Sequence, residues 1–325
     1  MAEMNLVQAI NLALGQEMQR DQSVVVMGED VGVDGGVFRA TEGLIAKFGA
    51  ERVIDTPLSE SGIIGSAIGM AIAGLKPVAE IQFSGFIYPA FEQIISHAAR
   101  IRNRSRGRFT CPLVIRSPYG AGIRALEHHQ ESTEVYFAHT PGIKVVMPSN
   151  PYDAKGLLAA SIRDPDPVIF YESLKLYRAF KMEVPEKDYE IEIGKAGIAR
   201  KGKDLTIVSF GAMMRPSLEA AEELQQEGIS AEVVDLKTVN PLDLETVIKS
   251  VEKTGRLLVV HEAPRTCGMG AEICARVAEK ALLELKAPVS RVTGYDTMPP
   301  LAKLENYYLP DANKIMIEAK RIAGF

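Results

Sequence analysis

Glu60 is the side chain of this sequence best placed to do acid–base chemistry. It follows the segment Thr56-Pro57-Leu58-Ser59 and opens a run of small and apolar residues, 61–73, whose pattern predicts a helix. Ser59 is a favoured N-cap residue type, which puts the carboxylate of Glu60 in the first helical turn. An acid at this position gains up to about 1 kcal/mol from the helix dipole, so a purely structural role competes with a catalytic one.

The helix predicted after Glu60 is thin. Gly62, Gly65 and Gly69 alternate with alanines and larger apolar residues, and each glycine inside a helix costs roughly 1 kcal/mol relative to alanine. A helix with so little side-chain bulk can approach another backbone or a planar ligand closely. The pattern indicates that some close approach of this kind offsets the cost of the glycines.

Two adjacent histidines, His128 and His129, form the second candidate for chemistry. An imidazole titrates near neutral pH, so a loop histidine is suited to act as an acid, a base or a hydrogen-bond donor. A solvated histidine without a role fits the sequence equally well. Adjacent histidines point in different directions and no HExxH pattern is present, so we expect no zinc site here.

The segment before these histidines, residues 120–125, has the GxGxxA spacing of a dinucleotide-binding turn. Such a turn needs a strand before it and a helix directly after it. Residues 126–132 lack the apolar period of a helix. A nicotinamide-binding oxidoreductase is therefore only a remote alternative.

Alternating strands and helices must position these side chains. Apolar, β-branched runs predict strands at 23–27, 52–55, 76–81, 112–116, 144–147 and 167–171, with helical patterns near 4–20, 60–74, 87–103 and 151–163. This alternation is typical of an α/β fold with a mostly parallel sheet flanked by helices.

A polar, charged stretch at 181–189 interrupts the pattern, and we interpret it as a linker. Beyond it, strands are predicted at 204–209, 231–234, 256–260 and 288–292, and helices at 214–227, 243–252, 268–284 and 311–323. A chain of 325 residues exceeds the usual size of a single core. We therefore predict two α/β domains, 1–187 and 188–325.

Composition excludes several classes of protein. Hydrophobic residues make up 46% and charged residues 24% of the chain, which is typical of a soluble globular protein. The net charge is −5, and basic residues are dispersed apart from one cluster at 100–108, which is better explained as a solvated helix end and loop than as a nucleic-acid site. The three cysteines have neither disulfide nor CxxC spacing, which favours a reducing compartment. No apolar run reaches the ~20 residues that span a bilayer and no signal-peptide pattern is present, so we expect a cytoplasmic protein without a membrane partner.

Six segments spread along the chain share one order and spacing. They are GEDVG at 28–32, GGVFRATEGL at 35–44, DTPLSE at 55–60, AEIQF at 79–83, PGIKVV at 141–146 and PYDAKGLL at 151–158. Together they resemble the β subunit of the decarboxylating, thiamin-diphosphate-dependent component of 2-oxo acid dehydrogenase complexes, a transketolase-like family. The resemblance runs essentially from end to end.

The resemblance implies a pyrimidine-binding domain of the transketolase kind followed by a transketolase-type C-terminal domain. In this family a segment that begins Gly-Asp-Gly and ends Asn-Asn holds the diphosphate and its magnesium, and this chain contains neither pattern. A partner α subunit is therefore implied, in an α2β2 heterotetramer. The implied acyl acceptor is the lipoyl domain of a dihydrolipoyl acyltransferase core.

The resemblance also assigns residues to the cofactor thiamin diphosphate. Glu60 would hydrogen-bond a ring nitrogen of the aminopyrimidine and favour the imino form that deprotonates the thiazolium carbon. Phe86 matches the aromatic residue that stacks on this ring, although by pattern alone it would be a core residue. Leu58 and Gln82 match its neighbours.

Two further site assignments follow from the same resemblance. His129 matches the histidine that assists reductive acylation of the lipoyl group, with His128 as the alternative. This chain has His129-Gln130-Glu131-Ser132 where many members have His-Ser-Gln-Ser. Some members also hold a potassium ion through oxygen ligands, which suit a hard cation. The matching positions are Leu113, Ser161, Ile162, Asp164 and Asp166.

The sequence thus predicts a β subunit that, with its α subunit, catalyses oxidative decarboxylation of pyruvate or a branched-chain 2-oxo acid. The related acetoin-cleaving dehydrogenase shares these motifs and is the nearest alternative. A catalytically silent scaffold that only docks the acyltransferase core is a third. The acid itself is left open, because part of the specificity lies on the α subunit.

Overall fold

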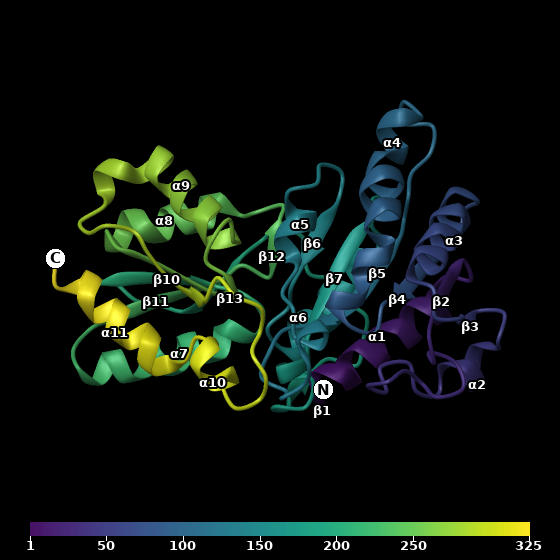
Figure 1. Ribbon diagram of the computed structural model, residues 1–325, viewed down its shortest axis with the longest axis horizontal. Helices are drawn as coiled ribbons and strands as arrows, with labels where there is room; N and C mark the ends of the chain where they lie inside the picture. Colours follow the sequence, from purple (N-terminus) through teal and green to yellow (C-terminus); the bar gives the residue numbers. More distant parts are fainter.

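Two sheets with helices on both faces form the two lobes of the chain (Figure 1). The structure is a computed structural model that describes residues 1–325. Each sheet is mostly parallel, which confirms the fold class predicted from the alternating pattern. No helix is both long and apolar enough to cross a membrane.

The first sheet has seven strands in the order β12-β6-β7-β5-β4-β2-β3. Their bounds are β2 (Val24–Gly28), β3 (Val53–Asp55), β4 (Lys76–Glu80), β5 (Val114–Tyr119), β6 (Lys144–Val146), β7 (Val168–Ser173) and β12 (Thr238–Asn240). Only the β12–β6 pair is antiparallel. All other carboxyl ends consequently meet at one edge of the sheet.

Helices cover this sheet on two sides. On one face lie α1 (Leu6–Arg20) and α6 (Pro151–Arg163), and on the other lie α3 (Glu60–Ile72) and α4 (Ile101–Arg104) (Figure 1). The second face also carries the 3-10 helices η1 (Ser84–Ala90) and η3 (Ala98–Arg100) and the π-helix η2 (Gln93–His97). Side chains alternate along each strand: Val24 and Val26 join the core under α1, whereas Met27 joins the core under α3. Burial of both strand faces explains their continuous apolar runs.

The second sheet has the order β14-β13-β10-β11-β9. Its strands are β9 (Gly197–Arg200), β10 (Leu205–Ser209), β11 (Ala231–Asp235), β13 (Leu257–Pro264) and β14 (Ser290–Gly294). The helices of this lobe are α7 (Met214–Gln226), α8 (Leu244–Thr254), α9 (Met269–Ala281), α10 (Glu305–Tyr308) and α11 (Ala312–Ala323). Every strand and helix predicted after residue 200 is present.

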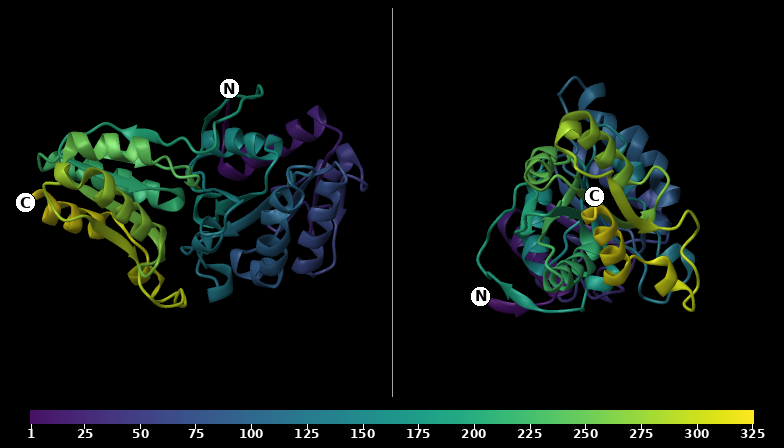
Figure 2. Two further views of the ribbon diagram at one scale, coloured as in Figure 1. Left: turned by 90° about the horizontal axis from the view of Figure 1, so that it is seen from above. Right: turned by 90° about the vertical axis from the view of Figure 1, so that its left-hand side faces the viewer.

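The structure differs in detail from three local predictions. The stretch read as a linker contains β8 (Met182–Val184), which pairs with β1 (Ala2–Met4) outside both sheets (Figure 2). The helix predicted over 87–103 is present but irregular, since it is a continuous series of 3-10, π and α segments from η1 to α4. Ser59 precedes α3 but makes no capping bond with its side chain.

The C-terminal part of the chain contributes one strand to the first sheet. β12 lies in the C-terminal part of the sequence but extends the first sheet beside β6. The passage from the first to the second sheet runs between β8 and β9 and includes residue 187. The domain division at 187/188 stays a prediction, because β12 crosses back over it.

Candidate active site

Four loops that leave neighbouring parallel strands carry the candidate residues. Glu29 follows β2, the segment 56–60 follows β3, Gln82 follows β4 and the loop 120–129 follows β5. Ligands of open α/β sheets bind outside the carboxyl ends of the strands. Sheet topology therefore gathers side chains that are up to a hundred positions apart in the sequence.

Glu60 is the first residue of α3 and only 8% exposed. No side chain of the chain forms a hydrogen bond or ion pair with its carboxylate. A second acid, Glu29, lies close by: burial, and then the charge of Glu60, raise the pKa of Glu29 above its ordinary value. The site thus places two carboxyl groups near each other at the ends of β2 and β3.

The other residues assigned to the cofactor lie on the loops after β3 and β4 and on η1, and their environments differ. Gln82 donates a hydrogen bond from Nε2 to Oδ2 of Asp30 at 3.1 Å. Phe86 is half-buried in η1, and its ring meets Phe83 edge-on at 5.4 Å. Leu58 is 79% exposed. An exposed leucine beside a buried acid leaves apolar surface at the rim of the site.

The two histidines have different environments. The ring of His129 lies 4.3 Å from Phe83 and 5.2 Å from Phe86, edge-on to both, and its buried Nδ1 has no hydrogen-bond partner. The side chain of His128 is 62% exposed and lies 3.9 Å from the Glu127 carboxylate. His129, and not His128, thus belongs to the aromatic cluster of the site. Which of the two is catalytic stays a prediction.

Gly85 permits this contact between η1 and the histidine loop. A Cβ at this position would lie 2.3 Å from the carbonyl oxygen of His128. Only a residue without a side chain allows the two backbones to approach so closely. Sequence inspection did not single out Gly85, because its role depends on a contact with a residue more than forty positions away.

A buried ion cluster holds the strand ends beneath the site. Arg116 on β5 is fully buried and donates to Glu80 at 2.6 Å and to Glu172 at 2.6 and 2.8 Å. Tyr177 donates to the same Glu172 at 2.6 Å. Removal of one partner from such a cluster costs about 3–5 kcal/mol, because an uncompensated charge is left in the interior. The cluster therefore ties β4, β5 and β7 together below Glu60 and Gln82.

The positions matched to potassium lie near the amino ends of the parallel strands, opposite the carboxyl ends that carry the cluster around Glu60. Asp164 accepts a bond from Lys144 at 2.5 Å, and Asp166 accepts one from Arg102 at 2.6 Å. The main-chain oxygen of Leu113 already accepts a bond from Val168. The donors remain oxygens of the kind a hard cation takes, but both carboxylates are paired with basic side chains of the chain.

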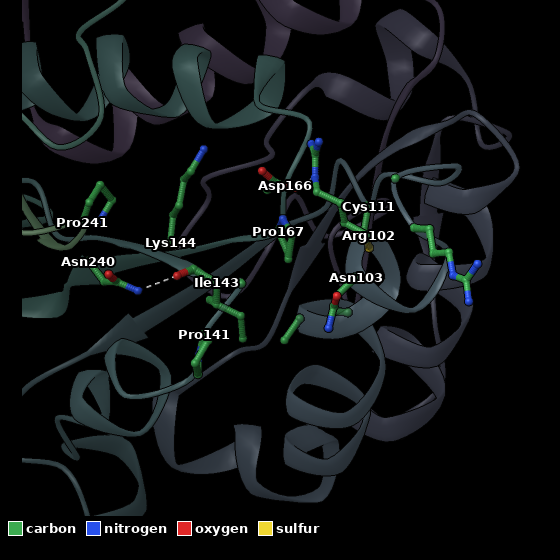
Figure 3. A pocket seen from close by; sticks show the side chains of 15 residues that line it. Arg102, Asn103, Cys111, Pro141, Ile143, Lys144, Asp166, Pro167, Asn240 and Pro241 are labelled. Carbon is green, nitrogen blue, oxygen red and sulfur yellow. Dashed lines mark hydrogen bonds and ion pairs between the residues drawn. The ribbon is translucent and has the colours of Figure 1, made fainter.

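A cavity of about 670 Å³ borders these positions (Figure 3). Lys144, Asp166 and Asn240 line it, and Asn240 donates to the carbonyl oxygen of Ile143 at 2.6 Å. It lies at the amino ends of β5, β6 and β7 and shares no residue with the cluster around Glu60. Its size alone does not make it the active site.

Glu29, Phe83 and Gly85 are members of the site that the sequence did not single out. Glu29 had a usable signal, since it stands directly after a buried strand in Gly28-Glu29-Asp30. Phe83 stands in the segment AEIQF but had no signal that pointed to its own role, and Gly85 had no signal. Their roles come from packing against the histidine loop.

Comparison with known proteins defines the class of this chain. The transketolase pyrimidine-binding domain matches residues 2–179, and the transketolase C-terminal domain matches residues 194–315. A solved structure described as a split-gene transketolase, an inactive β4 tetramer, superposes with a TM-score of 0.80 over 99% of both chains. At 24% identity this likeness concerns the fold. The chain is thus transketolase-like over nearly its whole length.

Curated relatives identify one family within the transketolase-like proteins. The pyruvate dehydrogenase E1 component subunit beta of Bacillus subtilis is 53% identical over 325 residues, covering 100% of both chains. The subunits of the same name from Acholeplasma laidlawii and Staphylococcus epidermidis are 53% and 52% identical over at least 99% of both chains. This chain belongs to the family of 2-oxo acid dehydrogenase E1 β subunits, as the six segments predicted.

Proposed function

We propose that this chain is the β subunit of a pyruvate dehydrogenase E1 component, with Glu60 and His129 acting in its two half-reactions. The observation that carries the proposal is the buried, unpartnered carboxylate of Glu60 at the point where the ends of the parallel strands converge. The 52–53% identity to subunits of that name over the full length favours pyruvate over a branched-chain acid.

The residues present suit the aminopyrimidine half of thiamin diphosphate. A planar, nitrogen-containing ring needs an apolar face and a partner for its ring nitrogen. Phe86 offers the first, and the Glu60 carboxylate, which has no partner within the chain, offers the second. When bound, the cofactor supplies the carbon nucleophile and the electron sink that decarboxylation requires.

Glu60 holds and returns a proton in this proposal. Its carboxylate is buried, lies close to Glu29 and has no partner within the chain, so it is available to hydrogen-bond a neighbouring ring nitrogen. Gln82, held toward the site by its bond to Asp30, serves to orient the ring. Leu58 excludes water from the rim.

His129 serves the second half-reaction. Its ring is fixed between Phe83 and Phe86, so an imidazole hydrogen is held in one direction. Such a group can donate a hydrogen bond or a proton while an acyl group moves to the sulfur of a lipoyl domain. Packing against Phe83 and Phe86 restricts rotation of the His129 ring more than a solvent-exposed loop would.

The partner α subunit binds beside α3 in this proposal. The exposed side of α3 carries Gly62, Ser66 and Gly69, so a second backbone can approach it closely. Replacement of Gly69, which has open space around it, by leucine should block assembly of the α2β2 heterotetramer. Gln226→Leu, which adds the same side chain to the exposed face of α7, is the control. Equal assembly of both variants in size-exclusion chromatography would contradict the placement.

Reconstitution tests the proposal as a whole. The chain co-expressed with its α subunit should turn over pyruvate faster than 2-oxoisovalerate or acetoin, with an artificial electron acceptor. The isolated chain should show negligible affinity for thiamin diphosphate in calorimetry, because magnesium and the diphosphate are held by the α subunit. Preference for 2-oxoisovalerate or acetoin would show that pyruvate is not the substrate. Tight, magnesium-dependent binding of thiamin diphosphate by the isolated chain would refute the assignment of diphosphate binding to the α subunit.

Potassium remains a smaller part of the proposal. We assign it to the main-chain and carboxylate oxygens at Leu113, Ser161, Ile162, Asp164 and Asp166. The melting temperature should be higher in potassium chloride than in sodium chloride of equal ionic strength. Identical melting curves in the two salts would contradict the assignment of a potassium site.

A further inference from the structure

The loop 120–129, which carries both histidines, is bonded to two carboxylates of the C-terminal lobe. Oε2 of Glu262, on β13, accepts the N–H of Ala121 at 3.1 Å. Oε1 of Glu305, the first residue of α10, accepts the N–H groups of Gly122 at 2.9 Å and of Arg124 at 3.0 Å. Both carboxyl groups are buried, with residues 4% and 2% exposed.

The loop has the backbone that these bonds require. Gly120, Gly122 and Arg124 all have positive φ, at 92°, 104° and 58°, and the N–H groups of Gly122 and Arg124 turn toward the same carboxylate oxygen. A Cβ at Gly120 would lie 2.8 Å from Oε1 of Glu262. The glycine spacing that resembled a dinucleotide turn therefore serves, in this fold, to admit carboxylates of the same chain.

The anchored residues lead directly to the histidines. Four residues separate Arg124 from His129, and Gln130 closes the loop by a side-chain bond to the carbonyl oxygen of Ala125. Beyond this, the backbone of His128 packs on Gly85 and the ring of His129 packs on Phe83. One end of the loop is thus fixed by the C-terminal lobe and the other by η1.

We propose that Glu305 and Glu262 are positioning residues that hold the histidine loop, so that the C-terminal lobe sets the orientation of His129 for acyl transfer. This inference rests on the proposed function for the role of His129, but not for the anchoring itself. Glu305 carries the larger share, because it accepts two N–H groups where Glu262 accepts one.

The surroundings of the two carboxyls fit an anchor better than a catalytic acid. Around Glu262 lie Tyr119, Glu134, Lys175, Tyr308 and Glu305. None of the residues matched to the cofactor is in this group. Burial, opposed by the bond from Ala121, raises the pKa of Glu262 to about 8, yet a carboxyl group accepts an N–H in either protonation state.

Hydrogen exchange on the full chain tests the anchoring without any activity. In Glu305→Ala the amides of Gly122 and Arg124 should exchange at least about tenfold faster. In Glu262→Ala the faster exchange should appear instead at the amide of Ala121. Glu305→Gln, which keeps an oxygen acceptor, should restore protection. Glu227→Ala removes an exposed glutamate that pairs with Lys320 in the same lobe and is the matched control. Unchanged exchange at Gly122 and Arg124 in Glu305→Ala would overturn the anchoring.

Kinetics of the reconstituted enzyme test the link to His129. Glu305→Ala should lower acyl transfer to the lipoyl domain about tenfold and decarboxylation with an artificial oxidant less than about threefold. In a His129→Ala background the same change should have little further effect, since both act through one imidazole. Equal losses in both assays, or additive losses in the double variant, would overturn the positioning role. Absence of turnover in the wild-type pair would refute the proposed function while leaving the exchange result to decide the anchoring.

Discussion

Replacement of Gly85 by alanine should push the histidine loop away from the aromatic cluster. The new Cβ would lie 2.3 Å from the carbonyl oxygen of His128 and 3.0 Å from two further backbone atoms of that residue. Ordinary contacts between such atoms are on the order of 3.5 Å, so a displacement of about 1 Å is needed. The obstacle is backbone and cannot rotate aside as a flexible side chain would.

The expected size of the effect follows from this displacement. Overpacking of this kind costs about 1–3 kcal/mol of stability, which lowers the melting temperature modestly without unfolding the chain. A misplacement of about 1 Å can lower the rate of a step that depends on an oriented group by roughly a hundredfold. We therefore expect acyl transfer to fall by about that factor, and decarboxylation by less, because Glu60 lies on another loop.

The assay compares the two half-reactions of the reconstituted heterotetramer, with a thermal melt as the measure of folding. Gly15→Ala is the matched control: this glycine lies inside α1, where a Cβ would meet Leu44 at an ordinary 3.7 Å. It should raise the melting temperature slightly, because alanine favours the helix. Wild-type acyl transfer in Gly85→Ala would refute the inference that this close contact positions His129.

Three further predictions concern single side chains. Glu60→Gln in the heterotetramer should lower decarboxylation by about two to four orders of magnitude with the fold intact, and retention of more than about half the rate would favour the helix-dipole role instead. His129→Ala should depress transfer to the lipoyl domain far more than decarboxylation with an artificial oxidant; a selective defect in His128→Ala alone would mean that the site assignment is one position off. Burial raises the pKa of Glu134 to about 7, so the folded chain keeps a proton that the unfolded chain loses above about pH 4.5. Stability should consequently fall by up to about 1.4 kcal/mol per pH unit between pH 5 and 7, and Glu134→Gln should remove that slope in urea titrations. Parallel wild-type and variant curves would contradict the shifted pKa.

The sequence by itself determined the class of fold and most of its elements. Strands such as β2 and β7 are buried on both faces, so their apolar runs are continuous and easily recognised. The family could also be read from the sequence, because six segments in fixed order are far more specific than one glycine motif. Glu60 was identifiable for the same reason, since it stands in one of those segments.

Short elements held by distant partners could not be read in this way. β8 and β12 have three residues each and form only because β1 and β6 supply hydrogen bonds. Local propensity carries too little information over three residues to compete with such tertiary pairing. The helical pattern after Phe83 was recognisable, but its division into 3-10, π and α segments was not.

Only the tertiary structure decided how the site is put together. The loop 120–129 reads as a glycine-rich turn in the sequence, and its meaning changes once Glu262 and Glu305 of the other lobe accept its N–H groups. His128 and His129 are equivalent in a linear reading, whereas packing exposes one and fixes the other between Phe83 and Phe86. The physical reason is that a residue type sets what a side chain can do, while its partners, which lie as far as 183 positions away, set its direction and its exposure to water.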